Sequence, residues 1–185
     1  MQQLKEKHTK EVIPEMMKKF GYKNVMEVPS IKKVVLNSSF GKMVAGKGSG
    51  EREKIENFIN QDLSAIAGQK PVLVKAKKSI AGFKLREGIY IASKVTLRRK
   101  KMWDFLERLI YLSLPRSRDF KGINMISIDS HGNMAIGFKE HISFPEIFSE
   151  KEKTIFGLEA IIVTNAKSKE EGIELFKLLG FPLKI

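Results

Sequence analysis

Residues 88–98 read Gly-Ile-Tyr-Ile-Ala-Ser-Lys-Val-Thr-Leu-Arg, and this stretch is the strongest indication of the fold class. Successive side chains of a strand point to opposite faces. One face carries Ile89, Ile91, Val95 and Leu97, and the other carries Tyr90, Ala92, Lys94, Thr96 and Arg98. A strand with one apolar and one polar face predicts an antiparallel sheet that is covered on one side and open on the other.

The flanking segments predict an α+β fold around this strand. Gly68 is expected to end a helix before it, and Pro115 a helix after it. The order strand, helix, strand, strand, helix, strand indicates a split β-α-β, ferredoxin-like or RRM-like core with helices packed on one face of the sheet. The predicted strands of this core cover 31–38, 71–75 and 89–98, and the predicted helices cover 55–66 and 102–113.

The first of these strands alternates less cleanly. Val34 and Leu36 are expected to point inward and Lys33 and Asn37 outward, but Val35 falls on the outward set.

Both ends of the chain add elements to the core. Residues 4–20 predict an N-terminal helix, which Pro14 would kink or divide. Further along the chain, strands are expected on both sides of the turn His131-Gly132-Asn133. A strand over 158–164 and a helix over 169–179, with Ser168 and Gly180 as its caps, complete the chain. We predict a single domain over 1–185, from which a basic loop over 76–88 projects.

The positive charge of the chain is concentrated in one segment. The 185 residues carry a formal charge of +13. Residues 70–101 hold eleven basic residues and one acid, so this segment alone has a charge of +10 and the remaining 153 residues have +3. A block of cations repels itself unless a polyanion lies against it. Nucleic acid is favoured over a membrane as the partner, because the segment lacks an amphipathic helical pattern.

Composition excludes several classes of protein. A hydrophobic content of 42% is enough to form a core, and the absence of cysteine excludes disulfides, thiolate nucleophiles and zinc knuckles. Charged residues interrupt the first thirty positions, so neither a signal peptide nor a membrane span is expected. We expect a cytoplasmic protein.

One segment resembles a phosphate-binding P-loop. Residues 41–48 read Gly-Lys-Met-Val-Ala-Gly-Lys-Gly and match the motif except at its last position, where Gly48 replaces the hydroxyl residue that holds magnesium. Residues 125–129 are a hydrophobic run that ends in an acid, as in the second motif of such enzymes. The expected antiparallel sheet argues against a nucleotide hydrolase. The alternative is a flexible loop whose Lys42 and Lys47 touch backbone phosphates.

No other catalytic or metal-binding pattern is present. His8, His131 and His141 are isolated in the sequence and are interpreted as surface or turn residues. We therefore expect no enzyme activity, no cofactor and no metal site.

The basic loop combines several RNA-binding features. Its centre, residues 77–88, reads Lys-Lys-Ser-Ile-Ala-Gly-Phe-Lys-Leu-Arg-Glu-Gly. Cations hold phosphates, and glycine allows close backbone approach. Phe83 is left with two interpretations: it stacks on a base or ribose, or it anchors the loop to the core.

At this loop the sequence resembles a known family. Residues 78–84 with Arg86, residues 94–98, 114–122, 68–71 and 144–146 together resemble the bacterial large-subunit ribosomal proteins that bind 5S ribosomal RNA. These blocks occur in family order from the first helix to the last, and the loop around 46–50 is extended relative to the family.

The resemblance implies a structural component of the central protuberance of the large ribosomal subunit. Its expected partners are 5S rRNA, large-subunit rRNA, the elbow of the P-site tRNA and other ribosomal proteins, including a small-subunit head protein in an intersubunit bridge. The residues implied for 5S rRNA are Asn37, Gln69, Lys94, Thr96 and Arg98. Those implied for tRNA are Lys77, Lys78, Ser79, Phe83, Lys84 and Arg86.

Three further cations are candidates for RNA contact, namely Lys33, Arg116 and Arg118. The arginines have an alternative role, because either could form an internal ion pair with Asp119. The acid-rich stretch 146–152 is a candidate surface for a basic protein partner.

Overall fold

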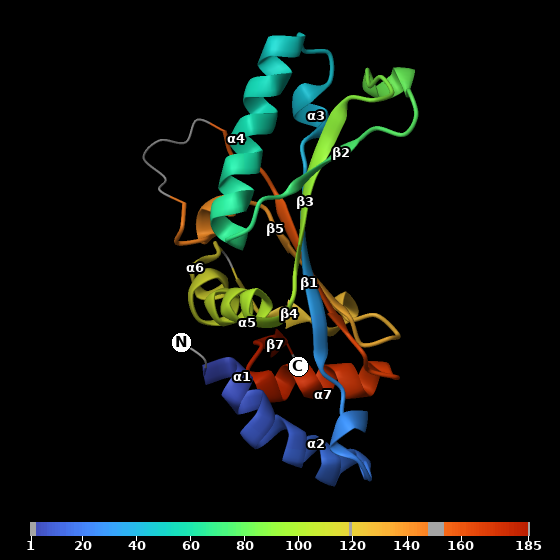
Figure 1. Ribbon diagram of the computed structural model, residues 1–185, viewed down its shortest axis with the longest axis vertical. Helices are drawn as coiled ribbons and strands as arrows, with labels where there is room; N and C mark the ends of the chain where they lie inside the picture. Colours follow the sequence, from blue (N-terminus) through green and yellow to red (C-terminus); the bar gives the residue numbers. More distant parts are fainter. Residues whose placement is uncertain (1–2, 119, 148–153, 185) are drawn as a thin grey trace. The chain divides into compact units, whose positions relative to one another are not determined.

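The computed structural model describes residues 3–118, 120–147 and 154–184. Its main sheet has five antiparallel strands in the order β2-β3-β1-β6-β5 (Figure 1). β1 lies next to β3 and not next to β2, which is the split arrangement predicted from the sequence. The strands are β1 (Ile31–Ser39), β2 (Val72–Lys75), β3 (Tyr90–Leu97), β5 (Met134–Phe138) and β6 (Leu158–Thr164).

The chain divides into two compact units. The first comprises Met1–Val34, Arg98–Ile136 and Ala160–Ile185, and the second comprises Val35–Leu97 and Gly137–Glu159. A single domain over 1–185 stays a prediction, and each unit is described by itself below.

The second unit is built around helix α4 (Ser49–Ala67), which follows the short helix α3 (Gly41–Val44) and runs along β3 (Figure 1). Its core contains the buried side chains of Phe40, Val44, Ile59 and Phe156. Gly68 ends α4 in the left-handed conformation with φ +62°, as predicted, and its N–H donates to Ser64 O. A short 3-10 turn, η6 (His141–Ser143), also belongs to this unit.

The first unit contains the N-terminal helix. It consists of α1 (Gln3–Lys7), a π-helical segment (His8–Val12) and α2 (Ile13–Phe20). Pro14 lies in the first turn of α2, where a missing N–H is tolerated, and the wider π turn precedes it. The helical run is unbroken over 3–20, so the irregularity near Pro14 is a π-helical segment and not a division into two separate helices. A 3-10 turn, η2 (Val25–Glu27), leads to β1.

The remaining helices of the first unit agree closely with prediction. Helix α5 (Arg99–Arg108) continues through a π-helical segment (Leu109–Ser113) into α6 (Leu114–Arg116), so Pro115 lies within the last turn and not just after it. Helix α7 (Lys169–Leu179) begins at Ser168, whose side chain accepts from Glu171 N, and ends at Gly180. β4 (Ile123–Asn124) and β7 (Leu183–Lys184) form a small parallel pair that the sequence did not predict.

Two sequence predictions are wrong. Residues 41–50 are not a continuous loop, because Gly41–Val44 is helical and α4 already begins at Ser49. In place of the strand expected before the turn at Gly132 there is a 3-10 turn, η5 (Met125–Ser127), with an isolated bridge between Ile128 and Met134. The side chain of Asn124 accepts from Ile126 N at 3.1 Å, and this local bond favours a turn over a strand.

Candidate nucleic-acid interface

Strand β3 has the two faces that its sequence predicted. Ser93, Val95 and Leu97 are buried, whereas Lys94 and the following Arg98 are exposed. Ser93 Oγ donates to Asn60 Oδ1 of α4 at 3.2 Å, so the buried side chains of this strand face that helix. Lys94 and the half-buried Thr96 therefore lie on the opposite, open face of the strand.

Strand β1 presents Asn37 on the same open face. Leu36 and Ser38 are buried, and Asn37 between them is half-buried, as is Lys33. Just past the strand, Phe40 N donates to Ile91 O at 2.9 Å. Because cross-strand neighbours share a face, the side chain of Phe40 lies on the covered side with Ile91, and that of Asn37, three residues earlier, lies on the open side.

Gln69 joins helix α4 to strand β3. It follows Gly68 directly, and its Nε2 donates to the backbone carbonyl of Thr96 at 3.4 Å. The structure therefore brings Gln69 and Thr96 together, although 27 residues separate them in the sequence. We call Asn37, Gln69, Lys94, Thr96 and Arg98 the open-face residues.

An apolar residue also lies on this face, and sequence reasoning missed it. Val72 of β2 pairs with Lys94 of β3, and its side chain is 69% exposed. In the sequence, Val72 and Val74 are two residues apart and are therefore expected on one face of a strand, but this strand is too short for the alternation to be recognised.

The basic loop is the connection of the β2–β3 hairpin, and it has internal structure (Figure 1). At its base, Ala76 N donates to Ile89 O at 2.8 Å and Gly88 N donates to Ala76 O at 3.0 Å. At its tip, an isolated bridge joins Ile80 to Leu85 around the 3-10 turn η3 (Ala81–Phe83). The exposed residues of this loop include Lys77, Lys78, Ser79, Phe83, Lys84 and Arg86.

Two side chains of the loop have distinct environments. The hydroxyl oxygen of Ser79 accepts from Glu87 N at 2.9 Å, so it closes the loop. The side chain of Phe83 is 67% exposed, and the alternative in which it anchors the loop to the core is therefore wrong. An exposed aromatic ring among cations is available for stacking on a base.

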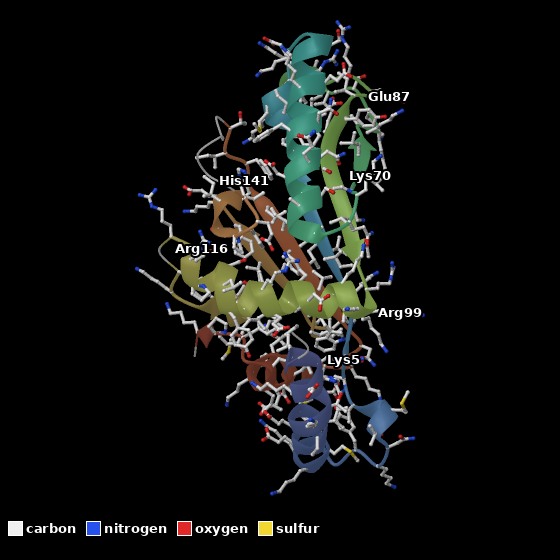
Figure 2. All side chains as sticks on the ribbon, turned by 60° about the vertical axis from the view of Figure 1, so that its left-hand side comes forward. Lys5, Lys70, Glu87, Arg99, Arg116 and His141 are labelled. Atoms are coloured by element: carbon white, nitrogen blue, oxygen red, sulfur yellow. The ribbon has the colours of Figure 1, made fainter. Side chains whose placement is uncertain are left out.

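The two remaining arginine candidates belong to the first unit. Arg116 and Arg118 are exposed, and Arg99 and Arg116 lie at the two ends of the helical run that begins with α5 (Figure 2). Asp119, the expected partner of these arginines, lies outside the described residues. So does most of the acid-rich stretch 146–152, of which only Glu146 and Ile147 are described.

The geometry of residues 41–48 contradicts a P-loop. In a P-loop, the residues between the two glycines form an extended cradle of N–H groups around phosphate. Here Gly41–Val44 is helical, and Val44 is buried in the core of the second unit. Its main-chain N–H donates to Phe40 O, so it is not free for a nucleotide.

Two histidines are buried, in contrast to the surface positions predicted for them. His141 is fully buried, stacks on Phe156 with ring centroids 3.8 Å apart, and places Nε2 3.6 Å from Asp62 Oδ2. His8 packs against Trp103, and burial lowers its pKa. His131 is exposed in its turn, as predicted. Within the described ranges, no three His, Asp or Glu side chains are grouped as a metal site would require.

An antiparallel sheet with one helix-covered face and one open, basic face defines a class of α+β proteins that bind RNA. Two family models match the chain. The model described as ribosomal protein L5 covers residues 24–86, and the one described as the C-terminus of the same ribosomal protein family covers residues 90–183.

Curated relatives match along the whole chain. The large ribosomal subunit protein uL5 of Desulforapulum autotrophicum is 50% identical over 184 residues, which cover 100% of this chain and 99% of the relative. The uL5 protein of Geotalea daltonii is 49% identical with the same coverage. That of Kosmotoga olearia is 51% identical over 181 residues, covering 98% of this chain and 96% of the relative. The chain therefore belongs to the ribosomal protein L5 family.

Family membership confirms the resemblance seen in the sequence. Ribosomal proteins of this family are structural components, so the chain is an RNA-binding ribosomal protein and not an enzyme. That the chain is part of the large ribosomal subunit follows from the same family. Among the described residues, none of the helices has the length and apolar character needed to cross a bilayer.

Proposed function

We propose that the chain is a structural protein of the large ribosomal subunit, in its central protuberance, and that it binds 5S rRNA through the open-face residues. The relatives are named as proteins of the large ribosomal subunit. The observation that carries the proposal is the bond from Gln69 to Thr96, because it brings together a residue of the turn after α4 and a residue of β3, both of which the family resemblance independently implies for 5S rRNA.

The chemistry of the open face suits a folded RNA. Lys94 and Arg98 supply cations for phosphates, and Asn37, Gln69 and Thr96 supply groups that donate and accept hydrogen bonds to ribose hydroxyls or base edges. Since the opposite side of β3 faces α4, RNA approaches this strand from one side only.

The basic loop makes the second proposed contact, with the elbow of the P-site tRNA. Every tRNA must be accepted there, which requires contacts to the backbone and not to particular bases. Lys77, Lys78, Lys84 and Arg86 are exposed and suit such contacts, and Phe83 offers a ring for stacking. Further proposed contacts are with large-subunit rRNA, for which Lys33, Arg116 and Arg118 are candidates, and with a small-subunit head protein in an intersubunit bridge.

Cosedimentation with ribosomal particles tests the assignment. Large subunits depleted of this protein should take up the purified chain, and hydroxyl-radical footprinting should then show protection of 5S rRNA. Substitution of Lys94 and Arg98 by alanine should remove that protection. Lys54→Ala is a matched control, because Lys54 is an exposed cation of α4 outside the open face. Uptake without any protection of 5S rRNA would refute the proposed 5S contact.

A further inference from the structure

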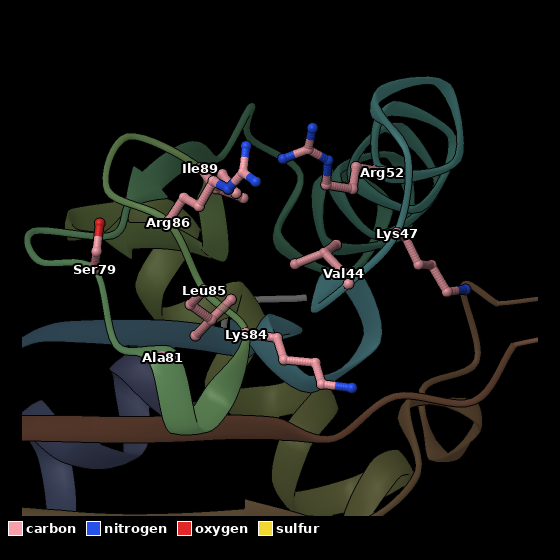
Figure 3. Close-up of a pocket in the computed structure, with 10 residues that line it drawn as sticks. Val44, Lys47, Arg52, Ser79, Ala81, Lys84, Leu85, Arg86 and Ile89 are labelled. Atoms are coloured by element: carbon pink, nitrogen blue, oxygen red, sulfur yellow. The ribbon is translucent and has the colours of Figure 1, made fainter.

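A cavity of about 520 Å³ within the second unit has residues 41–50, here called the Gly-rich segment, and the first turn of α4 on one side and the basic loop on the other. Four of its lining residues are cations, one from the Gly-rich segment, one from the first turn of α4 and two from the basic loop, and none is an acid. The lining cations are Lys47, Arg52, Lys84 and Arg86. Figure 3 shows the guanidinium groups of Arg52 and Arg86 pointing toward each other from opposite walls.

Arg52 is not fully satisfied within the protein. Its Nε atom is buried and has no hydrogen-bond partner among the described residues. Glu56, one turn further along α4, interacts with this guanidinium: burial raises the pKa of Glu56, and the charge of Arg52 opposes that rise. Glu56 is not a lining residue, so no carboxylate of the lining itself compensates the four cations, and a buried N–H without a partner is costly.

The two walls meet at Lys84. This residue has φ +51°, in the left-handed region that non-glycine residues rarely adopt, and its N–H donates to Ala81 O at 2.9 Å. Its stem runs over Gly46, where a Cβ would lie 3.8 Å from Lys84 Cδ. The backbone of the loop thus holds Lys84 against the Gly-rich segment in a strained conformation, and such strain is concentrated at functional sites.

We propose that this cavity extends the RNA contact of the basic loop and binds backbone phosphate through Lys47 and Arg52 together with Lys84 and Arg86. The inference deepens the proposed function, because it rests on RNA lying against the basic loop. It extends the interpretation that the sequence favoured over a P-loop, in which Lys47 contacts backbone phosphate: Lys47 holds a phosphate of RNA and not of a bound nucleotide.

The lining favours RNA backbone over a free nucleotide. A nucleotide site requires a slot for the base, but the apolar lining residues are Val44, Ala81, Leu85 and Ile89, with no aromatic ring among them. The exposed ring of Phe83 belongs to the same loop and suits a neighbouring nucleotide of an extended chain.

The test uses three probes with the full-length chain: total tRNA, an eight-residue uridine oligonucleotide and inorganic tripolyphosphate. The variant is Lys47→Gln with Arg52→Gln. The control is Lys54→Gln with Lys139→Gln, since both of these lysines are exposed in the same unit and neither lines the cavity. Circular dichroism checks folding, and Lys47→Glu, at an exposed position, provides a variant that leaves Arg52 in place.

We expect the Lys47/Arg52 variant to bind tRNA about tenfold or more weakly than the control, as for the loss of charge-assisted contacts. The slope of log K against log salt should fall by roughly 1.4 to 1.8, the value for two phosphate contacts. In the wild type, the oligonucleotide should shift the Arg52 Nε–H resonance, and tripolyphosphate should compete with it.

Three results would overturn the inference. They are equal tRNA affinity of variant and control when the wild type does bind tRNA, an Arg52 resonance that the oligonucleotide leaves unchanged, and a site that takes tripolyphosphate but no oligonucleotide. If the wild type binds the oligonucleotide at Arg52 but does not bind tRNA, the proposed tRNA contact fails and the cavity assignment stands.

Discussion

Gln69 Nε2 donates to the carbonyl oxygen of Thr96 at 3.4 Å, and this bond ties the turn after α4 to the main chain of β3. At that length it is a weak bond, whose loss should cost the free energy of unfolding about 0.5 kcal/mol. The bond matters chiefly because it positions the side-chain amide of Gln69 beside β3, which contains Lys94 and is followed directly by Arg98.

Gln69→Ala should therefore separate binding from stability. We expect 5S rRNA affinity to fall severalfold, since an amide that contacts RNA is lost, while the melting temperature changes by only a few degrees. Filter binding and thermal denaturation of the same samples measure both quantities. Unchanged 5S affinity would remove Gln69 from the interface.

Arg98→Ala should weaken 5S rRNA binding more strongly, by about 1 to 3 kcal/mol, as for a base or shape contact. Arg98 is exposed directly after β3, so its truncation leaves no cavity in the core. Lys54→Ala, which removes an exposed cation from α4, is the control for the general loss of positive charge. Equal losses in the two variants would show that Arg98 acts only through net charge.

Alanine at both Lys77 and Lys78 should affect the other RNA. These exposed side chains belong to the loop and not to the open face, so 5S affinity should stay within about twofold while tRNA affinity falls about tenfold. Parallel titrations with the two RNAs provide the comparison. A large loss of 5S affinity would contradict the division of roles between loop and sheet.

The open face could be predicted because its signal is local. Alternation over 88–98 separated the buried Val95 and Leu97 from Lys94 and Arg98, and β3 follows it from Ser93 onward, whereas Ile91 is half-buried like its neighbours Tyr90 and Ala92. The caps of α7 are equally local, since Ser168 and Gly180 act through bonds within a few residues.

The incorrect sequence predictions have two kinds of cause, namely tertiary packing and competing local hydrogen bonds. Glycines at 41 and 46 suggested a loop, but burial of Val44 against Phe40 and Ile59 favours a helical turn there. The hydrophobic run at 125–129 suggested a strand, but the side chain of Asn124 caps a 3-10 turn instead. The cationic cavity was unpredictable because Arg52 and Arg86 meet only through the fold.

The turn at Gly132 gives a prediction for acid stability. Burial by itself raises the pKa of Asp129. Its carboxylate, however, accepts hydrogen bonds from the side chain and the N–H of Asn133, both 2.8 Å long, and from His131 N. These bonds outweigh the effect of burial, so the pKa of Asp129 is lowered. A carboxyl group with a lowered folded-state pKa stabilises the protein above its unfolded pKa, and this contribution is lost as pH falls through the folded value.

Asp129→Asn should thus be less stable than the wild type at neutral pH, and the difference should shrink below about pH 4. Urea unfolding at several pH values measures it. A difference that is constant down to about pH 2 would show that the charge of Asp129 contributes nothing.

Competition for 5S rRNA distinguishes specific recognition from binding by charge alone. Labelled 5S rRNA bound to the full-length chain at moderate salt is challenged with unlabelled 5S rRNA, tRNA and duplex DNA of equal length, and retention on a filter is measured. If the open face recognises 5S rRNA, unlabelled 5S rRNA should compete at concentrations at least about tenfold lower than the other two. Equal competition by all three would show that the chain binds polyanions through charge alone, and it would contradict the specific role proposed for the open-face residues.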